Sequence, residues 1–325
     1  MNVRGLILTT VVLVAGLATV PGAALAAGFP ERPVNLVVAF AAGGPTDTIV
    51  RVLQEKLGER LGAPAVVLNK PGSGGLVAAE YVAKSKADGY NILVLSLSHL
   101  VRQAIDAKMP VDMLKDFEPI TTYVSLPIVF VTNGDSQFKT IEQMIDYGQK
   151  NPGKLTFGHS GIGATSHLSG ELFRLHTKIQ LKAVPFAGEA PTMTAVMGGH
   201  VDFGGFGGPT PRGKVESGEV RVLATLEEKR ISYFPNVPTF KEKGYPKIVM
   251  PSWYGFAVPV GTPKDVVVKL HDALRSAIKD PSIQAAIDKL GFAEIYRSPE
   301  ETKAFIRTEF DRFKELTTAA GITVQ

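Results

Sequence analysis

An apolar run that ends in glycines and continues as a helical pattern is the feature that most constrains this fold. Residues 36–40 are apolar, small residues occupy 41–45, and apolar residues then recur at helical spacing at Ile49, Val50, Leu53 and Leu57. This order predicts a buried strand, a glycine turn and a helix. The unit is typical of α/β folds.

The same turn is a candidate anion site. Gly43 and Gly44 carry no side chain that would keep a ligand from the backbone, and a helix start presents N–H groups without acceptors. We expect Asp47 to serve mainly as the N-cap, because its carboxylate would repel an anion. The expected contacts are the backbone from Ala41 through Ala42 to Gly44 and the Thr46 hydroxyl. The alternative is an ordinary strand-to-helix turn.

The N-terminal segment predicts export. Arg4 is followed by an almost wholly apolar stretch over 5–20, a Pro-Gly break and the small-x-small pattern Ala24-Leu25-Ala26. We expect residues 1–26 to be a signal peptide that is cleaved near Ala26. A membrane anchor is the alternative, but the apolar stretch is shorter than the ~20 residues that a span requires.

Composition excludes several classes of protein. The chain has no cysteine, which rules out a lipidated cysteine anchor, disulfides, thiol catalysis and zinc–thiolate sites. Its formal charge of +4 is small, and no basic run of the kind that binds nucleic acid is present. With 325 residues and 45% hydrophobic composition, the chain predicts a globular protein of two domains. No motif for a cofactor, a metal or catalysis is recognisable, so we do not expect an enzyme.

A second strand, small-residue loop and helix follow more than a hundred residues later. Residues 155–158 predict a strand, 159–166 contain small residues, and 167–176 predict a helix. The two loops lie in separate blocks of alternating strands and helices. We therefore expect a cleft between two lobes, in which one helix start from each lobe grips an anion.

Further candidate contacts lie in or near predicted loops and strand ends. Ser73 is either a contact or part of a turn, and Ser98 is expected on the cleft-facing side of a strand end. His167 either donates to a carboxylate or holds its loop. Asp202 either binds an ammonium group or makes a structural hydrogen bond, which is the interpretation we favour. The candidates of the second lobe are Ser160, Gly161, Gly163, Thr165 and His167.

Nine segments in register resemble one family. They are Phe29–Val34, Phe40–Asp47, Asn69–Gly75, Asp88–Tyr90, Asn151–Leu155, His167–Phe173, Gly198–Asp202, Pro235–Thr239 and Pro259–Pro263. In order and spacing they resemble the extracytoplasmic solute receptors of tripartite tricarboxylate transporters, the Bug family. The resemblance covers essentially the whole mature chain.

The resemblance implies a type II periplasmic binding protein fold, with mixed sheets flanked by helices and a hinged cleft. It implies a periplasmic, monomeric receptor without a cofactor, which delivers a small carboxylate to membrane permease subunits. Typical ligands are di- and tricarboxylates, acidic amino acids and aromatic acids. Loops 41–47 and 160–167 would hold the ligand from opposite lobes. We assign residues 27–127 and about 249–290 to lobe 1, and 128–248 and about 291–325 to lobe 2.

One departure from the family pattern bears on the ligand. Family members often carry Tyr-Lys-Gly where this chain has Phe186-Ala187-Gly188, so a cation is missing and a less charged distal end of the ligand is expected. Phe186, Phe203 and Phe206 either line an apolar cleft wall or pack in the core.

Two alternative functions remain open. Gly158, Ser160 and Gly161 partly match the Gly-x-Ser-x-Gly pattern of hydrolases, although the last glycine falls at 163 instead of 162. An exported hydrolase would use Ser160 with a histidine such as His167. A receptor that docks on a sensor protein instead of a permease is the second alternative.

Overall fold

The computed structural model describes residues 28–106, 108–161, 164–250 and 252–322. The expected signal peptide over 1–26 lies outside these residues. In the described ranges, no helix has the length and apolar character needed to cross a membrane.

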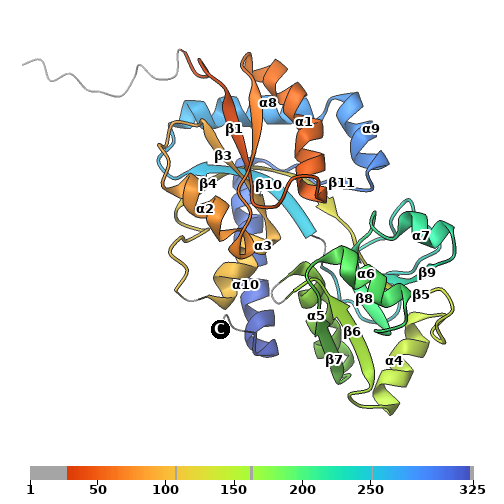
Figure 1. The fold of residues 1–325 in the computed structure, drawn as a ribbon. Helices are drawn as coiled ribbons and strands as arrows, with labels where there is room; N and C mark the ends of the chain where they lie inside the picture. Colours follow the sequence, from red (N-terminus) through yellow and green to blue (C-terminus); the bar gives the residue numbers. More distant parts are fainter. Residues whose placement is uncertain (1–27, 107, 162–163, 251, 323–325) are drawn as a thin grey trace, which may run out of the picture.

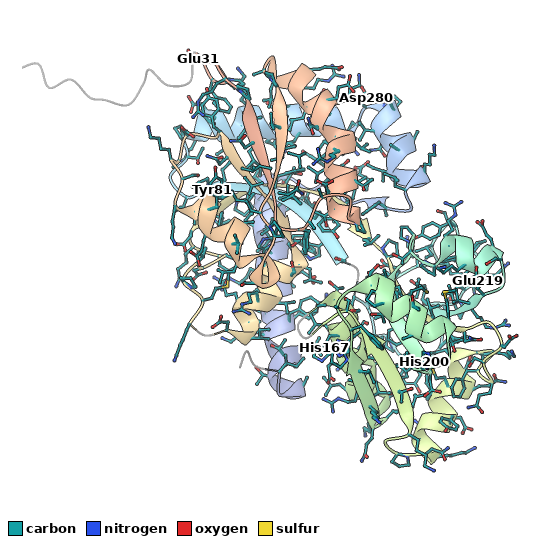
Figure 2. All side chains as sticks on the ribbon, in the orientation of Figure 1. Glu31, Tyr81, His167, His200, Glu219 and Asp280 are labelled. Carbon is teal, nitrogen blue, oxygen red and sulfur yellow. The ribbon has the colours of Figure 1, made fainter. Side chains whose placement is uncertain are left out.

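Two sheets, each flanked by helices, form two lobes (Figure 1), and Figure 2 shows the side chains on the same ribbon. The sheet of the first lobe has the strand order β11-β4-β10-β3-β1-β2, and that of the second lobe has the order β7-β6-β8-β5-β9. Both sheets mix parallel and antiparallel pairs. The two-lobed α/β architecture expected from the sequence is confirmed.

The first lobe takes most of its elements from the N-terminal third of the chain and from the C-terminal quarter. Its strands are β1 (Val34–Val38), β2 (Ala65–Asn69), β3 (Asn91–Ser96), β4 (Phe117–Leu126), β10 (Ser252–Pro259) and β11 (Ala293–Glu294). Its helices are α1 (Pro45–Leu61), η1 (Ser73–Gly75), α2 (Leu76–Ala83), α3 (Leu97–Ile105), α8 (Lys264–Ile278), α9 (Pro281–Lys289) and α10 (Pro299–Ala320).

The second lobe is built from the middle of the chain. Its strands are β5 (Ile128–Asn133), β6 (Leu155–His159), β7 (Leu181–Pro185), β8 (Phe203–Gly207) and β9 (Val220–Thr225). Its helices are α4 (Ile141–Lys150), α5 (Thr165–Thr177), α6 (Glu189–Met197) and α7 (Arg212–Glu216).

Strand β1 is apolar except for Asn35, because both faces of its sheet are covered. Leu36 and Val38 pack in one buried cluster with Ile49 of α1 and Leu270 of α8. Val37 points to the opposite cluster, which contains residues of α2 and α3. Alternate residues of a strand face opposite sides, so a strand buried on both faces reads as a continuous apolar run.

The core of the second lobe is aromatic. Phe130 of β5 lies with its ring centroid 5.2 Å from that of Phe203 and 5.5 Å from that of Phe173. Phe203 is fully buried. Its place in this cluster decides between the two interpretations of Phe203 in favour of core packing. Aromatic contacts of this kind stabilise a core beyond their buried area.

The segment after Gly291 departs from the expected division into lobes. Residues 291–325 were expected in lobe 2, but β11 pairs with β4 of the first sheet, and α10 packs mainly on α3 and β4. The buried Trp253 of β10 donates from its indole N–H to the Glu309 carboxylate of α10 at 3.1 Å. The expectation for this segment is therefore wrong, because strand pairing and a buried face of α10 hold it on the first lobe.

Candidate functional site

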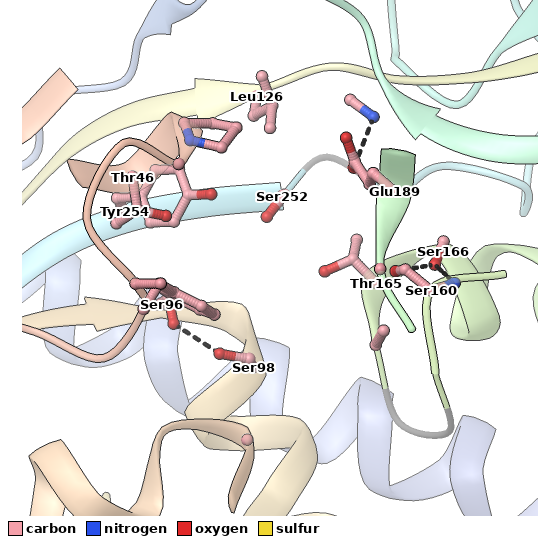
Figure 3. A pocket seen from close by; sticks show the side chains of 18 of the residues that line it. Thr46, Ser96, Ser98, Leu126, Ser160, Thr165, Ser166, Glu189, Ser252 and Tyr254 are labelled. Carbon is pink, nitrogen blue, oxygen red and sulfur yellow. Dashed lines mark hydrogen bonds between the residues drawn. The ribbon is translucent and has the colours of Figure 1, made fainter. Parts of the chain in front are cut away.

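A cleft of about 810 Å³ lies between the two lobes and takes its walls from both (Figure 3). From the first lobe it is lined by Phe40, Ala41, Ala42, Gly43, Gly44, Pro45, Thr46, Ser73, Gly74, Ser96, Ser98, Arg102, Ile105, Leu126, Ser252 and Tyr254. From the second lobe it is lined by Ile128, Ser160, Ala164, Thr165, Ser166, Gly188, Glu189, Gly205, Phe206 and Gly207. The volume suits a small organic ligand.

Helix α1 opens into this cleft without a side-chain cap. Its N-cap is Gly44, with φ −77° and ψ 170°, and Pro45 follows as the first helical residue. The first N–H groups of α1 have no acceptor within the helix, and the positive end of the helix dipole lies behind them. The expectation that Asp47 is the N-cap is wrong, because the helix begins at Pro45.

Asp47 lies beneath the loop instead of in the cleft lining. Its carboxylate accepts hydrogen bonds from the Gly43 N–H at 2.9 Å, from Arg51 Nε at 2.8 Å and from Asn69 Nδ2 at 2.9 Å. Asn69 also donates to the Phe40 carbonyl. Asp47 therefore fixes the loop as expected, although from the first turn and not from the cap. Because the Gly43 N–H donates to Asp47, this N–H is not available to a ligand.

The charge of Asp47 is stabilised by these partners. The hydrogen bond from Arg51 lowers the pKa of Asp47 most, and burial opposes it; with Gly43 and Asn69 contributing, the pKa falls to about 2. Asp47 is therefore ionised at neutral pH. Its charge is neutralised locally by Arg51, so it does not repel an anion as an unpaired carboxylate would.

Tyr254 and Ser252 bring hydroxyls from β10 beside the α1 start, as Figure 3 shows. Tyr254 is 6% exposed, and burial raises the pKa of its phenol while hydrogen bonds with Thr46 and Ser252 lower it. Tyr254 stays neutral and keeps a hydroxyl that donates. Strand β10 returns antiparallel beside β3, with Tyr254 opposite Ser96, and this pairing places both residues on one wall.

Ser96 ends β3, and Ser98 follows it at the start of helix α3. Ser96 is the N-cap of α3 and Ser98 lies within the first turn, so the expected strand position of Ser98 is wrong. The Ser96 and Ser98 hydroxyls are 2.8 Å apart, and both residues line the cleft. The sequence did not predict the helix over 97–105, because the apolar residue at its start continues the apolar run of β3.

His99 supports this helix start from inside. Its Nδ1 accepts the Ser96 N–H at 3.1 Å and lies 2.9 Å from the Ser96 hydroxyl. The side chain is fully buried, and burial lowers the pKa of His99 to about 4. His99 is therefore neutral and does not serve as a cation for a ligand.

Helix α5 opens into the cleft from the second lobe. Its N-cap is Ala164, which makes no side-chain cap, and Thr165 is its first residue. The Ser160 N–H donates to the Ser166 hydroxyl at 2.9 Å, and the two serine hydroxyls are 2.7 Å apart. Ser160 and Thr165 line the cleft as predicted. Gly161 is next to this loop but does not line the cleft, and Gly163 lies outside the described residues.

Three further predicted contacts lie away from the cleft lining. The His167 ring packs against the His159 ring at a centroid distance of 4.5 Å, and burial together with His159 lowers the pKa of His167 to about 4. Asp202 accepts hydrogen bonds from the N–H and the hydroxyl of Thr156, which is the structural role that the sequence favoured. Phe186 packs partly buried against the α6 side of the second sheet, whereas Phe206 does line the cleft.

Sequence reasoning missed several lining residues. Tyr254 and Ser252 come from a strand that pairs across the sheet from a distant part of the chain, so no local pattern indicated them. Arg102 is one turn along a helix that was not predicted. Glu189 had a local signal, since it is the first residue of α6 after Gly188 and follows β7. The chain therefore forms the unit of strand, glycine and helix start a third time at this position.

The lining is rich in hydroxyls and backbone N–H groups, and Arg102 and Glu189 are its charged residues within the described part of the chain. Such a set can orient a small polar ligand. The Ser160 hydroxyl, proposed above as a nucleophile, makes its hydrogen bond with Ser166.

The chain is similar in sequence to known proteins along most of its length. Residues 49–322 match the model of the tripartite tricarboxylate transporter family receptor. Protein BugT of Bordetella pertussis is 32% identical over 295 residues, which cover 90% of each chain.

Solved structures of two Rhodopseudomonas palustris proteins share the fold. Rpa4515 with adipate is 30% identical with a TM-score of 0.81, covering 91% of this chain and 99% of its own. MatC with bound malate is 29% identical with a TM-score of 0.78, covering 89% of this chain and 99% of its own. The family matched by residues 49–322 is one of substrate-binding receptors and not of enzymes. The chain belongs to the tripartite tricarboxylate transporter receptor family, the Bug proteins.

Proposed function

We propose that this protein captures a small carboxylate between its lobes and delivers it to the permease subunits of a tripartite tricarboxylate transporter. The observation that carries the proposal is the start of α1 at Gly44, which opens into the cleft opposite the start of α5. One carboxylate would lie on the free N–H groups of α1, assisted by the hydroxyls of Thr46 and Tyr254. Relatives that hold adipate and malate support this ligand class.

Closure of the cleft would report that a ligand is bound. Since both walls contribute polar groups, a ligand that bridges them binds the closed state more tightly than the open state. This difference in affinity shifts the protein toward the closed state. The permease would then recognise the closed form in the periplasm. Candidate ligands are di- and tricarboxylates, acidic amino acids and aromatic acids.

Calorimetry tests the proposal directly. Protein that is unfolded and refolded to remove co-purified ligand is titrated with a panel of these acids and with their uncharged amides. We expect at least one acid to bind and its amide to fail, because the α1 start favours negative charge. Failure of every acid on correctly refolded protein would refute the proposal.

Gly44→Asp separates binding from stability. The backbone at Gly44 is extended, with negative φ, and a Cβ there would have Ala41 O as its nearest neighbour at 3.5 Å. Aspartate is a favoured N-cap, so we expect the free energy of unfolding to stay within about 1 kcal/mol of the wild-type value or to rise. The added carboxylate would occupy the anion position and reduce ligand affinity at least about tenfold.

Gly44→Asn is the matched control for this substitution. It adds the same volume and the same capping oxygen without the charge. We expect it to retain more affinity than Gly44→Asp. Equal losses in both variants would show that space, and not charge, matters at this position.

A further inference from the structure

The two charged residues of the cleft lining lie on opposite walls. Arg102 belongs to α3 of the first lobe and pairs with Asp106 at 2.7 Å, and its Nε is buried without a hydrogen-bond partner among the described residues. Glu189 is the first residue of α6 in the second lobe. The first-lobe wall thus combines a cation with the start of α1, whereas the second-lobe wall carries a carboxylate. This polarity does not match a ligand that is negative at every end.

The carboxylate of Glu189 is held in place by two donors. The Gly207 N–H donates to Oε1 at 3.3 Å, and the Thr210 hydroxyl donates to Oε2 at 2.8 Å. Burial raises the pKa of Glu189 above its ordinary value and outweighs these two hydrogen bonds, which lower it, so a cationic group of the ligand beside the carboxylate would favour its charged form. Both oxygens accept hydrogen bonds and keep lone pairs that are available to a further donor.

Glu189 faces the wall that holds the α1 start. Figure 3 shows its side chain across the cleft from Ser252 and Tyr254. The charge of Glu189 contributes to the raised pKa of Tyr254, so the two walls lie within electrostatic range of each other. A ligand carboxylate at the α1 start therefore leaves the rest of the ligand close to Glu189. A second carboxylate there would meet a like charge in a partly dry site.

We propose that Glu189 is a specificity-determining residue that pairs with a protonated amine of the ligand. The ligand is thus a carboxylate that also bears an ammonium group, and a simple dicarboxylate of the same length binds less well. This inference rests on the proposed function, since it takes the carboxylate at the α1 start as given. A charge-assisted hydrogen bond to a partly buried carboxylate is among the strong polar contacts of proteins.

Three ligands of equal chain length test the inference. Glutarate has two carboxylates and no amine, L-glutamate adds an amine, and δ-aminovalerate has an aminomethyl group in place of one carboxylate. By calorimetry we expect the better of the two amine-bearing ligands to bind at least about tenfold more tightly than glutarate, because opposite charges meet at Glu189. Glutarate binding as tightly as both amines would overturn the inference. Failure of all three, and of every other acid tested, would instead refute the proposed function.

Glu189→Gln assigns the preference to this residue. The glutamine oxygen can accept the Gly207 N–H, and its amide can donate to Thr210, whose hydroxyl can accept as well as donate. We therefore expect a folded variant, checked by thermal unfolding, in which the preference for the amine falls to about threefold or less. Glutarate should bind this variant at least as tightly as it binds the wild type.

Glu216→Gln is the matched control. Glu216 lies on α7 of the same lobe, its side chain is 71% exposed, and it does not line the cleft. This variant should keep the wild-type preference. A preference that survives in Glu189→Gln, or that disappears equally in Glu216→Gln, would show that Glu189 does not set it.

Discussion

At the scale of single residues, Asp47 shows how a buried side chain shapes a backbone loop. It receives one donor from the loop, one from its own helix and one from the end of β2. We expect Asp47→Ala to cost about 2–3 kcal/mol in the free energy of unfolding, because buried donors lose a charged acceptor. Carboxylate affinity should fall too, since the loop at the α1 start loses the contacts that fix its conformation. Urea unfolding and calorimetry measure the two effects.

Arg51→Met provides the comparison for Asp47. The Arg51 side chain is 47% exposed, so loss of its ion pair should cost less than about 1 kcal/mol. A cost as large as that of Asp47→Ala would show that the ion pair, and not the loop contacts, holds Asp47.

The sequence predicted most of the residues around the α1 start and fewer on the facing wall. Ala41–Gly44 and Thr46 line the cleft because a strand, glycine and helix occur there in direct succession. Tyr254 could not be predicted, since its place depends on the pairing of β10 with β3. Asp202 and His167 are polar residues near strand or helix ends, and their positions alone did not indicate whether they face the cleft.

At the scale of elements, α3 depends on a neutral histidine. The pKa of His99 is about 4 in the folded protein, against 6.5 for an unperturbed histidine. The unfolded chain therefore binds more protons between these values, and the free energy of unfolding decreases as pH falls from about 6.5 to 4. The contribution of His99 reaches about 3 kcal/mol at the lower end. Urea unfolding across this pH range measures it.

His99→Asn should reduce this pH dependence. An asparagine oxygen can accept the Ser96 N–H but does not titrate in this range. His159 and His167 also have lowered pKa values, so part of the dependence should remain. An unchanged pH profile in His99→Asn would contradict the assignment to His99.

At the scale of the whole molecule, the chain passes between the lobes between β4 and β5 and again between β9 and β10. These two crossings permit the lobes to rotate about the cleft. We expect the radius of gyration from small-angle X-ray scattering to decrease when a binding carboxylate is added. Gly44→Asp should show no such decrease at the same ligand concentration. A constant radius in saturated wild-type protein would argue against closure.

The division of the C-terminal segment was the main error at this scale. The sequence led us to assign residues 291–325 to lobe 2, but a helical pattern does not say which lobe a helix covers. The decisive contacts are long-range: β11 adds to β4, and Trp253 reaches Glu309 on α10. Local patterns indicate elements, but only pairing between distant segments assigns them to a sheet.

The start of α1 at Gly44 also bears on how ligand choice can change by mutation. Main-chain N–H groups are present whatever the side chain, so substitutions can obstruct such a site but cannot remove its donors. Side chains on the opposite wall, Glu189 among them, have no such protection. A library randomised only on the second-lobe wall should therefore yield receptors for new acids, all of which still present one carboxylate to the same helix.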